Sequence, residues 1–130
     1  MPKKKIEVEY YSFGIYDGWE PDSDQIPQIV KHTTKIPAQL GLEFGYVIDI
    51  HGARGQWLDF QIDHPPFKNE KGNIAPSFKG KEYISSAEYR FFVGDTFWEP
   101  IQDKVGKWTL SCWIQKQLVA QKTFQIFIAN

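Results

Sequence analysis

Apolar and polar residues alternate most regularly near the end of the chain, over residues 106–114 and 118–128. Alternation with a period of two is typical of a β-strand with one buried face, and a three-residue connection between two such runs predicts a β-hairpin. A hairpin with one strongly apolar face is not stable alone in water, so the rest of the chain must supply the sheet that covers it. The expected inward positions are Trp108, Leu110, Cys112, Ile114, Phe124, Ile126 and Ile128.

Further strands are predicted at residues 6–16, 42–50, 57–63 and 84–93, with a short extended piece at 29–35. In the first of them the apolar phase changes by one residue near Tyr10 and Tyr11, which indicates a β-bulge or a strand that is buried on both faces. Strand 42–50 alternates cleanly, so we expect it to be half-buried. Its inward residues would be Leu42, Phe44, Tyr46, Ile48 and Ile50, and its outward residues Glu43, Gly45, Val47 and Asp49.

Turn and loop signals separate these strands. Connections are expected at residues 17–28, 36–41, 51–55 and 94–96, and 97–103 is a short aromatic segment. The longest irregular stretch is predicted at 64–83, and loops of that size are often functional.

No window shows an apolar stripe at helical spacing with helix caps. Six or seven strands, or up to eight if the short segments are counted, indicate an all-β fold. The pattern favours an antiparallel, immunoglobulin-like β-sandwich, and a small closed β-barrel is the alternative.

Composition sets limits on the class of protein. The chain has 130 residues, of which 42% are apolar, so we expect one domain over residues 1–130 with an ordered core at about 6–128. The net charge of −1 gives no electrostatic reason to expect nucleic acid or an anionic membrane as a partner. The only cysteine, Cys112, is expected to point inward as a small apolar residue.

Residues 1–9 carry lysines followed at once by Glu7 and Glu9, which does not fit a signal peptide. No apolar run reaches membrane-spanning length, so we expect no membrane insertion. The chain as written is expected to be cytoplasmic, and it would be periplasmic if a cleaved segment preceded it.

Several short blocks resemble the DUF3859 family, a bacterial domain of unknown function. They are residues 13–16 (Phe-Gly-Ile-Tyr), 33–41 running into Phe44-Gly45, 64–66 (His-Pro-Pro), and 106–109 continuing to 118–124. The most specific block is Thr-Thr-Lys-Ile-Pro-Ala at 33–38. The resemblance supports the sandwich and implies no activity and no catalytic residues.

Metal-binding residues are sparse. A zinc site could assemble in space from His32, His51 or His64 with Asp49, Asp59 or Asp63, but the histidines lack ligand-type spacing. The acidic stretch of Asp17, Glu20, Asp22 and Asp24 could bind calcium, but it does not match an EF-hand loop. We favour surface or capping histidines and a solvated acidic turn, and therefore predict no metal and no cofactor.

No serine lies in a nucleophile motif and no glycine loop suits a phosphate, so we predict no catalytic residues and no enzyme. A carboxylate pair from distant strands would still be compatible with the sequence.

The tryptophans are the most suggestive residues, because Trp113 has odd parity in a strand whose even residues face inward. An exposed aromatic ring can anchor a protein or stack on a sugar. We expect a non-enzymatic binding domain that engages a protein partner through loops or a strand edge. The alternative is a carbohydrate- or small-ligand-binding module that uses Trp19, Trp98 or Trp113.

Overall fold

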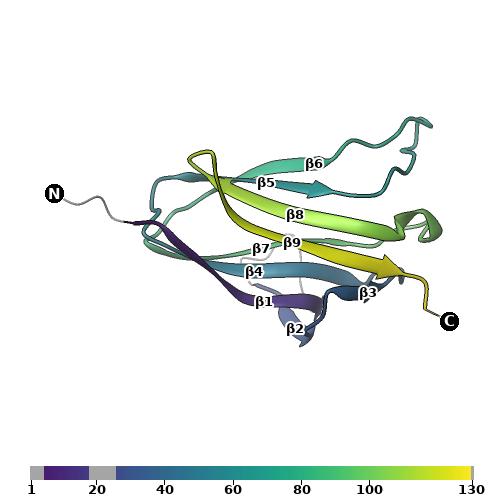
Figure 1. Cartoon of the computed structure of the whole chain (residues 1–130), viewed down its shortest axis with the longest axis horizontal. Coiled ribbons are helices and arrows are strands. Elements are labelled where there is room, and N and C mark those ends of the chain that lie inside the picture. Colours follow the sequence, from purple (N-terminus) through teal and green to yellow (C-terminus); the bar gives the residue numbers. More distant parts are fainter. Residues whose placement is uncertain (1–4, 18–25, 130) are drawn as a thin grey trace.

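The computed structural model describes residues 5–17 and 26–129, which form two β-sheets packed face to face (Figure 1). One short 3₁₀ turn, η1 (Gln102–Lys104), precedes the last hairpin. The strands are β1 (Glu7–Asp17), β2 (Gln28–Lys31), β3 (Lys35–Pro37), β4 (Glu43–His51), β5 (Trp57–Asp63), β6 (Phe78–Tyr83), β7 (Glu88–Thr96), β8 (Gly106–Ile114) and β9 (Gln117–Phe127).

The four-stranded sheet has the order β2-β1-β4-β7 and the five-stranded sheet the order β3-β9-β8-β5-β6. Neither sheet closes on itself, so the predicted sandwich is confirmed and the closed barrel is wrong. All neighbours are antiparallel except β3 and β9, which pair in parallel. The chain changes sheets between β2 and β3, so the single extended piece predicted at 29–35 is in fact two short strands.

Aromatic rings fill the middle of the sandwich. The ring of Phe44 on β4 stacks on Phe97 at 5.0 Å between centroids and meets Trp108 and Phe124 edge-on at 5.4 Å. Trp108 is fully buried, and its Nε1 donates a hydrogen bond to the carbonyl oxygen of Lys104 at 2.8 Å. The inward positions predicted for the last hairpin are buried, Cys112 included; Ile128 is the exception, because β9 ends at Phe127.

The predicted bulge in the first strand is confirmed. The register of β1 against β4 passes from Tyr10 opposite Ile48 to Ser12 opposite Val47, so Tyr11 is the extra residue. Tyr10 reaches the other sheet, where its hydroxyl donates to the carbonyl oxygen of Gln121 and accepts from the same residue's backbone N–H. Tyr10, the residue before the bulge, therefore links the two sheets.

Strand β4 alternates as predicted, but the expectation that it is half-buried is wrong. Its outward residues Val47 and Glu43 are 0% and 8% exposed. Across this face the rings of Tyr16 and Phe92 meet edge-on at 5.0 Å, directly beside a row of three paired glycines. Gly14, Gly45 and Gly94 form that row. A Cβ at Gly94 would overlap the ring of Phe92, whereas a Cβ at Gly14 or Gly45 would overlap backbone atoms of the neighbouring segment.

Two predictions about the edge strands are also wrong. Residues 78–83, predicted to be irregular, form strand β6, and residues 94–96, predicted to be a turn, belong to β7. The inward residues of β6 are Phe78, Gly80 and Glu82, which give no apolar alternation. A Cβ at Gly80 would overlap the ring of Phe60, so this ring takes the place of an inward side chain on β6.

The final hairpin closes through Gln115 and Lys116 alone. Both residues have positive φ, 53° and 64°, as a two-residue turn of the I′ type requires. Within the described residues, no helix has the length and apolar character needed to cross a membrane.

Candidate functional site

Two of the three tryptophans that the sequence singled out lie in different parts of the structure. Trp113 lies on the outer face of the five-stranded sheet, and Trp98 lies in the connection between β7 and β8. They line two hollows that share no residue. Trp19 lies outside the described residues. Trp98 and Trp113 therefore do not form one combined site.

The outer face around Trp113 follows from strand register. On β8 the even residues fill the core, so Ser111 and Trp113 point out. Trp113 pairs with Asp59 on β5, which pairs with Lys81 on β6. The neighbouring row runs from Ser111 through Gln61 to Lys79, so two rows of outward side chains cross three strands.

A hollow of about 540 Å³ lies over these two rows. Its centre is the paired backbone of Phe60 and Gly80, because the Phe60 ring points inward and packs against Phe91 at 5.7 Å. The half-buried Trp113 stands on one side of it. The remaining lining residues are Asp59, Gln61, Lys79 and Lys81. An apolar ring thus faces polar side chains across a shallow depression.

A second aromatic pair lies next to the hollow on the same face. Trp57 and Tyr83 are cross-strand partners, 54% and 47% exposed, and their rings meet at 5.2 Å with an interplanar angle of 60°. Trp57 is two residues from Asp59, the partner of Trp113. Neither Trp57 nor Tyr83 is among the site residues predicted from the sequence. The odd parity of Trp57 in strand 57–63 is a usable signal, whereas Tyr83 lies in the stretch predicted to be irregular.

The charges in the hollow are unevenly paired. Lys81 Nζ lies 3.8 Å from Asp59 Oδ1, and both side chains are largely open to solvent. Lys79 has no ion-pair partner within residues 5–17 and 26–129. Gln61 donates a hydrogen bond to Asp63 Oδ1 at 2.7 Å, which orients its amide along β5. The hollow therefore presents one ring, one amide and one uncompensated cation.

The second hollow is lined mainly by the β5–β6 and β7–β8 connections. Both connections lie at the same end of the sandwich (Figure 1). It has about 380 Å³, and its apolar wall is formed by Phe67, Phe78 and Trp98. Lys104 is only 1% exposed, and its Nζ lies 4.5 Å from the ring centre of Phe67 and 4.6 Å from that of Trp98. The same ammonium group donates to the Pro100 carbonyl oxygen and to Asp103, so its charge is already compensated.

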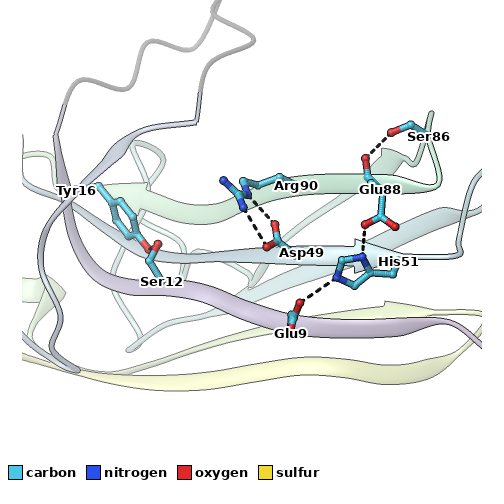
Figure 2. A network of polar contacts seen from close by, with 8 residues as sticks. All are labelled: Glu9, Ser12, Tyr16, Asp49, His51, Ser86, Glu88 and Arg90. Atoms are coloured by element: carbon cyan, nitrogen blue, oxygen red, sulfur yellow. Dashed lines mark hydrogen bonds and ion pairs between the residues drawn. The ribbon is translucent and has the colours of Figure 1, made fainter.

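A polar cluster lies on the outer face of the four-stranded sheet (Figure 2). The ring of His51 lies between two carboxylates, with Nε2 3.0 Å from Glu9 and Nδ1 bonded to Glu88. These hydrogen bonds raise the pKa of His51, with that from Glu9 as the largest contribution. Beside it, Arg90 donates two hydrogen bonds to Asp49 at 2.6 and 3.1 Å. The cluster joins β1, β4 and β7 electrostatically.

The histidines do not meet in the fold. The two nitrogens of His51 face carboxylates on opposite sides of its ring, and those of His64 lie 2.8 Å from the carbonyl oxygens of Pro65 and Pro76. His32 packs edge-on against Phe13. Among the described residues no three ligand-type side chains are grouped to hold a metal ion. Of the acidic stretch considered for calcium, only Asp17 lies within the described residues.

The family comparison matches residues 4–126 to the family described as "Domain of unknown function (DUF3859)". The chain belongs to this family. A crystal structure of an immunoglobulin-like protein from Pseudomonas aeruginosa is similar, with a TM-score of 0.76 and 21% identity over 96% of this chain and 98% of that one. At this identity the likeness concerns the fold. No curated protein matches the sequence.

Proposed function

We propose that this DUF3859 domain is a binding module that takes a carbohydrate on the outer face of its five-stranded sheet, with Trp113 as the stacking surface. The observation that carries the proposal is the half-buried Trp113 at the side of a hollow whose other outward side chains are polar. The exposed pair of Trp57 and Tyr83 extends the aromatic surface on the same face.

The chemistry of the hollow suits a sugar better than an apolar ligand. A pyranose has an apolar C–H face that packs on an aromatic ring, and hydroxyl groups at its rim that need donors and acceptors. Trp113 offers the ring, while Gln61, Asp59 and Lys81 supply amide, carboxylate and ammonium groups around it. A few placed polar groups beside an apolar surface are typical of small-ligand sites.

The test is calorimetric titration of the purified chain with a panel of soluble oligosaccharides of different backbones. Trp113→Ala is expected to weaken binding of the responding sugar roughly tenfold or more, as for a central aromatic anchor. Trp98→Ala, at the opposite end of the sandwich, is the matched control and should bind like the parent. Thermal unfolding of both variants checks that the sheet is intact, and Trp113→Phe, which keeps an aromatic ring, should recover part of the affinity.

The proposal is wrong if the parent binds no member of the panel, or if the Trp98 and Trp113 variants lose affinity equally.

The loops at the other end favour a second candidate function, binding of a protein partner. Two hollows of about 380 and 340 Å³ adjoin there and share Glu99 and Pro100 in their lining. Trp98 and Leu40 stand in these hollows and are 38% and 62% exposed. Exposed apolar side chains grouped beside hollows mark protein-interaction surfaces. The partner would insert an apolar side chain between these loops.

Loops are a better candidate than the β6 edge for such a partner, because Lys79, Lys81 and Glu82 place charges along that edge and oppose strand addition. In a pull-down with the immobilised chain, the partner should be retained by the parent and by Trp113→Ala but lost from Trp98→Ala. The purified partner should then protect residues 98–104 from hydrogen exchange. Retention that is independent of Trp98 excludes this candidate.

A further inference from the structure

We infer that the sugar unit bound in the Trp113 hollow carries an anionic substituent, a carboxylate or a sulfate, which Lys79 recognises. This inference rests on the proposed carbohydrate function and names the ligand class more narrowly. It follows from the positions of the charged side chains around the hollow, because a neutral sugar would leave the Lys79 charge without a partner.

Strands β8 and β6 both flank β5, and neighbouring strands lie about 4.8 Å apart, so Trp113 and the lysines of β6 stand about 10 Å apart at their backbones. One pyranose ring stacked on Trp113 therefore extends its rim toward β6. A substituent on that rim meets the side chains of Lys79 and Lys81.

The two lysines of β6 differ in how their charges are compensated. Lys81 lies near Asp59, which compensates part of its charge. Lys79 is exposed and lacks an ion pair among the residues the structure describes, and its cross-strand partner is the neutral Gln61. The next carboxylate along β5, Asp63, accepts hydrogen bonds from Gln61 and Ser77 on Oδ1. The free positive charge of the hollow is therefore on the Lys79 side.

The charges of the two rows favour one orientation of an acidic sugar on this face. Asp59 lies in the same row as Trp113 and repels an anion placed there, whereas the neighbouring row ends at Lys79. Ring and anion are thus recognised in different rows, which orients an acidic sugar in one direction across the face. A single exposed charge pair of this kind contributes roughly a two- to fivefold preference.

The experiment compares matched ligands on the intact chain. Oligogalacturonate is titrated against its neutral methyl ester, and a sulfated galactan oligosaccharide against its desulfated form, at low and at high salt. The parent is expected to prefer the anionic member of at least one pair by roughly two- to fivefold at low salt, and to lose the preference as salt is raised. The pair that responds distinguishes carboxylate from sulfate.

Two variants locate the effect. Lys79→Gln should abolish the preference for the anionic member of the responding pair. Lys107→Gln is the matched control, because Lys107 is an exposed lysine on the outer face of β8 that does not line the hollow. Lys79→Arg should retain the preference.

The outcomes separate the two proposals. If neutral and anionic sugars bind equally and Trp113→Ala weakens both, the carbohydrate function stands and the role of Lys79 is wrong. A preference that survives Lys79→Gln likewise overturns the inference. If no sugar binds, the carbohydrate function is wrong, and the inference about Lys79 is wrong with it.

Discussion

Replacing Glu43 by glutamine should remove a pH dependence of stability that the structure builds into the four-stranded sheet. Glu43 is 8% exposed, its Oε1 is buried with no hydrogen-bond partner among the described residues, and its Oε2 lies 3.5 Å from the Thr96 hydroxyl. Burial raises the pKa of Glu43 from 4.5 to about 7. The hydrogen bond from Thr96 offsets part of that rise, and the charges of Asp17 and Asp95 add to it.

The sign follows from proton binding. Because the pKa of Glu43 is higher in the folded than in the unfolded chain, the folded state holds the proton more tightly, and folding is weakened as pH rises from about 4.5 to 7. A pKa difference of about 2.5 corresponds to about 3 kcal/mol of unfolding free energy lost across that interval. Above pH 7 the carboxylate is ionised in both states, so the loss is complete.

Glutamine has nearly the same shape, stays neutral and can still accept a hydrogen bond from Thr96. We therefore expect Glu43→Gln to be close to the parent at pH 4.5 and more stable by about 3 kcal/mol at pH 8. Urea unfolding of both chains at several pH values measures this difference, and subtraction removes the contributions of groups common to both. Parallel stability curves, or a variant that is weaker at pH 8, would refute the reasoning.

Two further predictions concern the same sheet. Gly94→Ala should lower the free energy of unfolding by about 2 kcal/mol or more in urea titrations, because the added Cβ overlaps the carbonyl oxygen of Phe44. Gly72→Ala, with open space around it, should cost only about 1 kcal/mol, for its positive φ, and an equal loss at both sites would contradict the overlap argument. His51→Gln should lower the melting temperature at pH 5.5 and have little effect at pH 9. Because the pKa of His51 is raised in the folded chain, its two glutamates stabilise the fold most strongly below about pH 6.5. A loss that does not change with pH would exclude a role for the imidazolium.

Much of the architecture can be predicted from local alternation. The period of two along a strand is a property of the backbone, so the inward faces of β5, β8 and β9 and the burial of Cys112 could be derived without knowing which strands are neighbours. The bulge at Tyr11 was visible for the same reason, since one extra residue reverses the parity of every residue after it.

Features that depend on strand neighbours could not be predicted in this way. Strand β6 has no apolar alternation, because the ring of Phe60 fills the space at Gly80. The outer side of β4 was expected to face solvent, and only register shows that Tyr16 and Phe92 meet over the glycine row. Each case joins residues that lie far apart in the chain.

In the candidate site, too, some features follow from local alternation and others depend on which strands are neighbours. The sequence by itself determined that Trp113 points away from the core, because parity along β8 is local. Only the tertiary structure decided that Trp57, Tyr83 and Lys79 share its face and that Trp98 lies at the other end of the sandwich. The physical reason is that side-chain direction is set by the pleat of one strand, whereas the neighbours of a side chain are set by pairing among three.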